Sequence, residues 1–121
     1  MKYILLVKHD EAVLGALSET ERADMLAESV QLANQLHSSG QYFDAAPLHS
    51  SANAARVAVR DGKQIVTDGP FAETREQVGG YFIVDAGSLT EAIAIAGRIP
   101  GARIGIVEVR PVGEAHGLPE L

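Results

Sequence analysis

The sequence predicts an α+β fold in which two β-α-β units share one sheet and a β-hairpin is inserted between them. Three observations support this prediction. Apolar runs of strand length recur along the chain, two Ser-x-x-Glu capping boxes each open a helical pattern, and one Asp-Gly pair separates two alternating segments. Without the hairpin the order is β-α-β-β-α-β, which is the ferredoxin-like order.

The first half of the chain is predicted to form a strand, a long helix and a second, weaker strand. Residues 3–7 form a compact apolar run within a strand predicted over residues 2–8, and we expect both faces of this strand to be buried, as in a central strand. Ser18 and Glu21 form a capping box that opens a helix of about five turns, which Gly40 ends. The inward face of this helix is predicted to carry Met25, Leu26, Val30, Ala33, Leu36 and His37. The weaker strand covers residues 43–48.

The hairpin is predicted from Asp61-Gly62, a strong signal for a two-residue turn. This turn sets the pairing of residues 55–60 with residues 63–68, so that Ala55 lies opposite Asp68. Alternation then places Val57, Val59, Gln64, Val66 and Asp68 on one face, which we expect to be buried. The other face carries Arg56, Ala58, Arg60, Lys63, Ile65 and Thr67.

The second half repeats the strand–helix–strand order. Residues 80–86 form an apolar strand, and a capping box of Ser88 and Glu91 opens the second helix. The inward face of this helix is predicted to carry Leu89, Ala92, Ile93 and Ala96. Pro100-Gly101 ends the helix, and residues 104–110 form the last strand. We therefore expect one domain over residues 1–112 and a C-terminal tail over residues 113–121.

Composition excludes several classes of function. The 121 residues suit a single domain, and 46% hydrophobic residues can form a core that dimerisation would extend. The net charge of −6, without a basic run, argues against nucleic acid as a partner. The chain has no cysteine, no close histidine pair and no apolar run of about 18 residues, so we expect no metal site, no membrane span and a cytoplasmic protein.

Asp68 stands at the end of the expected buried hairpin face, immediately before Gly69-Pro70. Two interpretations are compatible: the aspartate opens a turn, or it is a desolvated carboxylate that accepts a proton. The loop that follows is long enough to cover a cavity, with Glu73 or Arg75 at its mouth, although its alternating charges also fit a solvated face.

The same region carries a family resemblance. The matching segments are Arg60-Asp61-Gly62, residues 66–76 (VTDGPFAETRE), Gly79-Gly80-Tyr81, residues 96–100 (AGRIP) and residues 107–112 (VEVRPV). They resemble the DGPF-domain branch of the YCII-related family. The resemblance implies a ferredoxin-like fold that dimerises through sheet packing as a dimeric α/β barrel, in bacterial cytosolic proteins, many of unknown function. It also implies a proposed His–Asp catalytic pair, and some members are linked to sigma-factor genes.

The resemblance assigns Asp68 as the catalytic aspartate, because it matches the aspartate of the motif. Its histidine has no clear match, and His49 is the candidate nearest in the predicted sheet. Arg56 and Arg60 are candidates to bind an acidic substrate, with structural ion pairing as the alternative. Glu73 and Tyr81 complete the substrate-binding set. Of the remaining histidines, His9 is expected in an exposed loop, His37 partly buried at the helix end, and His116 in the tail.

The sequence therefore predicts a small-molecule-binding protein that acts as a homodimer without a cofactor. A lyase or isomerase activity on a small acidic or aromatic molecule, with Asp68 as the base, is the first hypothesis for its chemistry. The alternative is a ligand-sensing or transcription-associated regulatory module, and a third reading is a structural homodimer whose motif only shapes loops.

Overall fold

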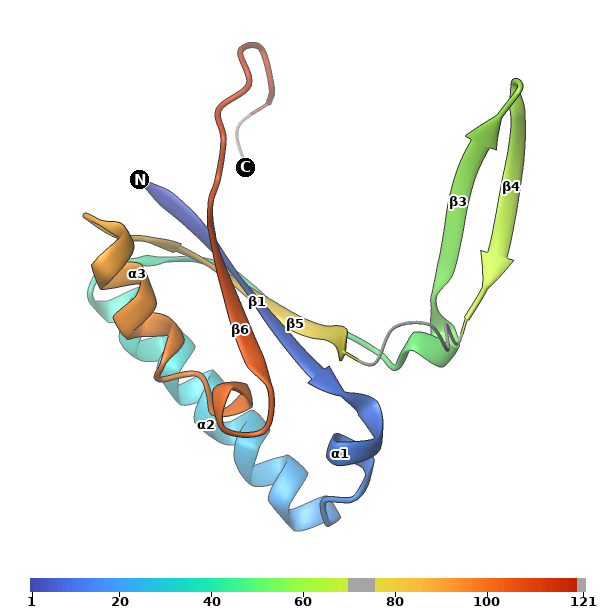
Figure 1. Cartoon of the computed structure of the whole chain (residues 1–121). Helices are drawn as coiled ribbons and strands as arrows, with labels where there is room; N and C mark the ends of the chain where they lie inside the picture. Colours follow the sequence, from blue (N-terminus) through green and yellow to red (C-terminus); the bar gives the residue numbers. More distant parts are fainter. Residues whose placement is uncertain (70–75, 120–121) are drawn as a thin grey trace.

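The structure is a computed structural model that describes residues 1–69 and 76–119 (Figure 1). In chain order the elements are β1 (Lys2–Asp10), α1 (Glu11–Gly15), α2 (Glu19–Ser38), β2 (Tyr42–Pro47), η1 (Ser51–Asn53), β3 (Ala55–Arg60), β4 (Lys63–Asp68), β5 (Glu76–Asp85), α3 (Leu89–Ala96), η2 (Pro100–Arg103) and β6 (Ile106–Pro111). The order confirms the predicted α+β, ferredoxin-like arrangement with an inserted hairpin.

The main sheet has the strand order β2-β5-β1-β6, and every neighbouring pair is antiparallel. The long helices α2 and α3 lie on one face of this sheet, and no described helix covers the other face, which we call the open face (Figure 1). The central strands β1 and β5 are therefore buried on one side only, which differs from the expectation that the first strand is buried on both.

The core lies between the helices and the covered face of the sheet. Its buried members are Tyr3, Leu5, Leu32, Leu36, Phe82, Val84, Ala86, Ala92, Ile95, Ala96 and Ile99. Leu5 and Val84 have no exposed surface, and Leu36 keeps only 1%. Because these side chains come from four separate elements, their burial fixes how α2 and α3 lie on the sheet.

Helix α2 begins as predicted and packs differently from the prediction. The Ser18 hydroxyl accepts the Glu21 N–H at 3.1 Å, and the Glu21 carboxylate accepts the Ser18 N–H at 3.0 Å, which lowers the pKa of Glu21. The predicted inward face divides into two parts. Leu36 is buried in the core, whereas Leu26 and Val30 remain 52% and 53% exposed. The N-terminal half of α2 therefore leaves an apolar surface uncovered.

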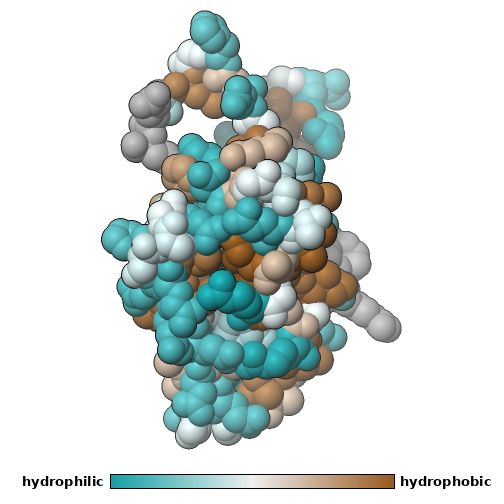
Figure 2. All heavy atoms as spheres, turned by 90° about the vertical axis from the view of Figure 1, so that its left-hand side faces the viewer, coloured by the Kyte–Doolittle hydropathy of each residue, from teal (hydrophilic) through white to brown (hydrophobic). Residues whose placement is uncertain are grey.

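Helix α3 is also rotated relative to the prediction. Its buried residues are Ala92, Ile95 and Ala96, whereas Leu89 and Ile93 are half-exposed. The short helix places Ile95 one turn after Ala92, so the buried stripe passes through Ile95. Hydrophobic residues are consequently visible among hydrophilic ones in the middle of the side shown in Figure 2.

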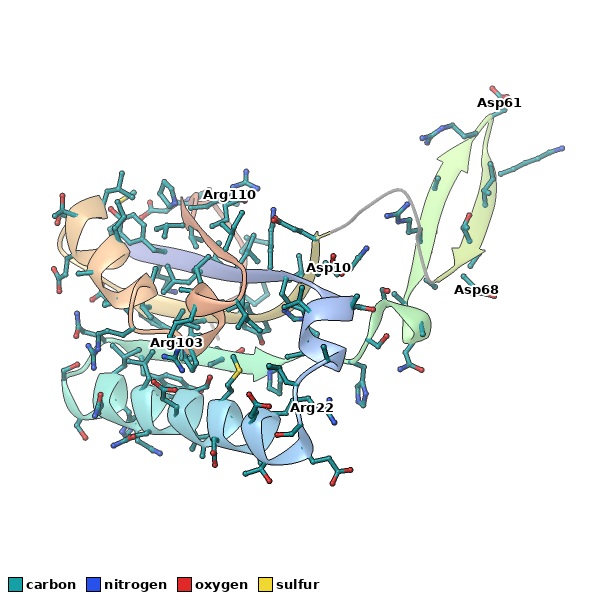
Figure 3. All side chains as sticks on the ribbon, turned by 60° about the horizontal axis from the view of Figure 1, so that its bottom comes forward. Asp10, Arg22, Asp61, Asp68, Arg103 and Arg110 are labelled. Atoms are coloured by element: carbon teal, nitrogen blue, oxygen red, sulfur yellow. The ribbon has the colours of Figure 1, made fainter. Side chains whose placement is uncertain are left out.

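Strands β3 and β4 form a separate two-stranded sheet, which we call the arm (residues 55–68). Its register is the predicted one, and Asp61 and Gly62 at its tip have the positive φ angles of 52° and 73° that a type I′ turn requires. The arm projects away from the helices (Figures 1 and 3). The expected burial of its valine face is wrong for the single chain, because Val57 and Val59 are each 62% exposed and Val66 is 56% exposed.

Several features lie outside the predictions. Asp10 caps the short helix α1 by accepting the Ala12 N–H at 2.9 Å, and β5 begins at Glu76, several residues before its apolar run. A register shift opposite Val7 and Lys8 marks a bulge in β5, where Gly79 is the extra residue. No helix within the described ranges is long and apolar enough to cross a membrane.

Candidate functional site

Asp68, the predicted catalytic aspartate, lies at the base of the arm, where β4 ends (Figure 3). Its side chain is exposed. The next residue, Gly69, donates its N–H to the Ala54 carbonyl at 2.7 Å, and a side chain at this position would overlap the Ser51 carbonyl oxygen. Gly69 is therefore required by close backbone approach rather than by an unusual backbone angle, which corrects the sequence interpretation.

His49, the predicted partner of Asp68, lies in the loop between β2 and η1 and is exposed. It borders a cavity of about 420 Å³ that Arg56 and Gln77 also line. Asp68 is absent from the described lining of this cavity. The single chain thus brings His49 and Arg56 together and leaves the Asp68 carboxylate outside their cavity.

The other predicted substrate-binding residues are dispersed. Arg60 is exposed near the tip of the arm and donates to the carbonyl of Val59 at 2.9 Å. The Tyr81 hydroxyl donates to Asp44 Oδ2 at 2.8 Å, and this hydrogen bond, together with burial, raises the pKa of Tyr81. Glu73 lies outside the described residues.

A larger cavity than the one beside His49 lies between α2 and the covered face of the main sheet. It has a volume of about 580 Å³, within the range of about 300–1,000 Å³ that is common for small-molecule sites. Its apolar lining comprises Val7, Leu14, Met25, Leu26, Val30, Ala33, Phe82, Ile99 and Ile104. We call it the α2 cavity. Leu26 and Val30 border it and are both more than half exposed, so the cavity is open to solvent along α2.

His9 is the most buried polar residue of the α2 cavity. The expectation of an exposed loop histidine is wrong, because β1 extends through His9 and leaves only 8% of the residue exposed. The imidazole lies against Gly79, where an added Cβ would stand 2.6 Å from Nδ1 and 3.0 Å from Nε2. Gly105 approaches from another side, since a Cβ there would be 3.1 Å from the His9 Cβ. Gly79 therefore makes room for the ring, and Gly105 permits close packing against the backbone at His9.

Neither ring nitrogen of His9 makes a hydrogen bond to any described residue. Among the described residues, every buried side-chain nitrogen or oxygen that is closed to solvent has a hydrogen-bond partner. The ring nitrogens must therefore retain some accessible surface. An imidazole in this state can donate or accept one hydrogen bond from a molecule that enters the cavity.

Two more basic side chains line the same cavity. Arg22 lies in the first turns of α2 beside α1 (Figure 3) and donates from Nη1 to the Leu17 carbonyl at 2.8 Å. His37 lies in the last turn of α2 and contacts Tyr42 edge to face, with ring centroids 6.2 Å apart. His37 is exposed rather than partly buried as expected.

Glu11 connects the end of β1 to the loop that carries His49. Its carboxylate accepts the Ser51 N–H at 2.6 Å and the hydroxyls of Ser51 and Ser50 at 3.0 and 3.2 Å. The Ser51 N–H is the main reason that the pKa of Glu11 is lowered. This contact holds η1 against the end of β1, next to His9.

Sequence reasoning missed His9 and Arg22 as site residues. Of the predicted site residues that the structure describes, only Tyr81 borders the α2 cavity. The signal for His9 was its position directly after an apolar strand, together with Gly79-Gly80 in the strand that pairs with it. Glycines in a strand can leave space for a side chain of the neighbouring strand, and this interpretation of Gly79-Gly80 would have linked the pair to His9.

Comparison with known proteins gives a consistent result. The family model of the YCII-related domain matches residues 1–116 of the chain. The chain is also similar to an uncharacterized protein, R00369, from Rhizobium meliloti (strain 1021), with 34% identity over 114 residues, which cover 93% of this chain and 92% of that protein.

Proposed function

Because the chain belongs to the YCII-related family, whose matched relative has no assigned activity, we propose its function from its own geometry: it is a small-molecule-binding protein whose ligand site is the α2 cavity. The observation that carries this proposal is a cavity of about 580 Å³ with an apolar lining and a buried histidine that has no described hydrogen-bond partner. A few polar groups in an apolar cavity are the usual composition of a ligand site.

The packing of α2 supports the same proposal. Met25, Leu26 and Val30 form an apolar surface that the single chain leaves facing the cavity instead of filling it with core side chains. Covering this surface with a ligand would remove apolar area from water, at about 25 cal/mol per Å² buried. The ligand is therefore expected to have a substantial apolar part.

Binding can be tested by ligand-observed NMR with a library of small aromatic and aliphatic molecules. Ser29 lines the cavity, and its hydroxyl bonds only to the Met25 carbonyl of its own helix among the described residues. Ser29→Phe should therefore fill the cavity and abolish binding of the compounds found with the unmodified chain. Ser38→Phe is the matched control, because Ser38 is exposed at the end of α2 and outside the described lining. A folded Ser29→Phe variant that binds the same compounds would refute the site.

We also propose that the chain forms a homodimer through the open face of its main sheet. The apolar residues Ile4, Leu6, Ile83 and Ile106 stand at alternate positions on this face, and no described helix covers them. Leu6→Glu should shift the sedimentation coefficient from that of a dimer to that of a monomer. Val13→Glu, on α1, should leave it unchanged. A monomer for the unmodified chain at micromolar concentration would contradict the proposal.

A cofactor-free lyase or isomerase activity with Asp68 as the base is the finer proposal. In the single chain Asp68 is exposed at the base of the arm, so it could act only if the arm of one copy covered the site of another. Asp68→Asn would then abolish turnover and preserve ligand binding. The alternative is a non-enzymatic ligand sensor, and it is favoured by the absence of any carboxylate among the described residues that line the cavity. A sensor would bind its ligand without converting it.

A further inference from the structure

The described lining of the α2 cavity includes basic side chains and no acidic ones. The chain contains 16 acidic and 10 basic residues, yet no Asp or Glu occurs among the described lining residues. Arg22, His9 and His37 all line the cavity. A cavity that excludes carboxylates in an acidic protein has an electrostatic preference for an anion, because the nearest fixed charge is the Arg22 guanidinium.

Arg22 has unused donors. Its one described hydrogen bond is from Nη1 to the Leu17 carbonyl at 2.8 Å, and it forms no ion pair with any described carboxylate. Arg103 provides a contrast within the same chain, because both of its terminal nitrogens bond to Glu28, at 3.0 and 2.7 Å. The carboxylate of Glu21, the residue directly before Arg22, accepts the Ser18 N–H in the capping box. The remaining donors of Arg22 are thus available to a ligand carboxylate.

His9 supplies an independent observation. It is more than nine-tenths buried, it lines the cavity, and its ring nitrogens have no described partner. Gly79 leaves the space that the ring occupies, and Gly105 lies against the backbone and Cβ of His9. Because its ring nitrogens keep some accessible surface, this mostly buried imidazole can form a hydrogen bond with a polar atom of a molecule that enters the cavity.

We propose that the ligand of the α2 cavity is a small amphipathic carboxylic acid, bound as its anion. Its carboxylate accepts hydrogen bonds from Arg22, its apolar body contacts Met25, Leu26 and Val30, and His9 bonds to a polar atom of the ligand. Carboxylate rather than phosphate is favoured because a carboxylate carries one charge, which the Arg22 guanidinium balances, whereas a phosphate group carries about 1.5 to 2 and would place the excess against a largely apolar lining. This inference rests on the proposed function of the same cavity.

The test compares matched charged and neutral probes by isothermal titration calorimetry at fixed pH and ionic strength. Phenylacetate and hexanoate are the carboxylates, and phenylacetamide and hexanamide are their neutral counterparts. We expect at least one carboxylate to bind about tenfold more tightly than its amide, because hydrogen bonds to charged groups are roughly twice as strong as neutral ones. Arg22→Gln should remove this preference and leave amide binding unchanged.

Arg98→Gln is the matched control, because Arg98 bonds to Gln35 at 2.7 Å, is exposed, and is absent from the described lining. It should bind both carboxylates as the unmodified chain does. If Arg22→Gln does not fold, Arg22→Lys serves instead, since it keeps the charge but loses the bidentate geometry, and it should weaken carboxylate binding by a smaller factor. His9→Gln should weaken every probe that binds.

The outcomes separate the two proposals. If carboxylates and amides bind equally and Ser29→Phe abolishes both, the cavity is a ligand site and the carboxylate inference is wrong. A carboxylate preference that survives in folded Arg22→Gln would also overturn it. If no probe binds the unmodified chain, or if every probe that binds it also binds the folded Ser29→Phe variant equally well, the proposed function is wrong. The carboxylate inference is then wrong as well.

Discussion

Gly79→Ala tests whether the His9 ring occupies the space that the glycine provides. A Cβ at Gly79 would stand 2.6 Å from Nδ1 and 3.0 Å from Nε2 of His9, whereas nonbonded carbon atoms pack best at about 3.5–4.0 Å. Cε1 of the ring would be closer still, so the ring must move by well over an ångström in a site that is already buried. Overpacking of this kind costs about 1–3 kcal/mol, partly offset by about 0.5–1 kcal/mol that alanine gains over glycine in a strand.

The decisive measurement is a double-mutant cycle with His9→Ala. In that background the obstructing ring is absent, so Gly79→Ala should become neutral or slightly stabilising, with a coupling energy of about 1–3 kcal/mol. Urea unfolding followed by circular dichroism gives the four free energies, at one protein concentration because self-association would shift them. Gly97→Ala is the control, since its Cβ would meet nothing closer than 3.6 Å. An equal cost of Gly79→Ala in both backgrounds would refute the reasoning.

Three further predictions concern stability and use the same unfolding assay. Gly105→Ala should lower the free energy of unfolding by about 3 kcal/mol or more, which is a larger loss than for Gly79→Ala. The reason is that its Cβ would overlap a backbone oxygen of β1, which cannot rotate away as a side chain can. A smaller loss would contradict this packing. Leu36→Ala, at a side chain that is 1% exposed, should cost about 2–5 kcal/mol, whereas Val13→Ala, at 44% exposure, should cost less than about 1 kcal/mol. Glu11→Gln should destabilise the chain at pH 7. Because the Ser51 N–H lowers the folded-state pKa of Glu11 below its usual 4.5, this contribution is present above that value and is lost as the pH falls through the folded-state pKa. The free energies of unfolding of the unmodified chain and of Glu11→Gln should therefore converge at low pH. A difference between them that does not change with pH would contradict the role given to the Glu11 carboxylate.

The fold was predictable because its signals are local. The caps at Ser18 and Ser88 and the turn at Asp61-Gly62 fix helix starts and hairpin register through contacts within a few residues. The structure contains the full capping box at Ser18 and the predicted turn. At Ser88 the hydroxyl caps α3 as predicted, whereas the Glu91 carboxylate accepts the Gly87 N–H in place of the Ser88 N–H. The helix faces were less predictable. An apolar pattern marks which residues avoid water, but it cannot tell Leu36 in a core from Val30 beside a cavity.

The site was less predictable because it depends on long-range contacts. His9 and Gly79 are far apart in sequence, and their contact follows from the antiparallel pairing of β1 with β5 and from the bulge in β5 at Gly79. The Asp68 hypothesis depended on burial of the arm's valine face, whose valines are more than half exposed in the single chain. The pairing register of β3 with β4 could be derived from the turn. Which element, if any, covers a face of this hairpin could not be derived from the sequence.

The central claim, that the α2 cavity is the ligand site, is tested most directly by NMR chemical-shift mapping. A probe that binds, titrated into the ¹⁵N-labelled chain, should perturb the amide signals of His9, Arg22 and Gly79 in a saturable way with one dissociation constant. The same titration should leave the signals of His49 and Asp68 unchanged. Perturbations confined to His49, Arg56 and Asp68 would place the ligand at the base of the arm and contradict the account.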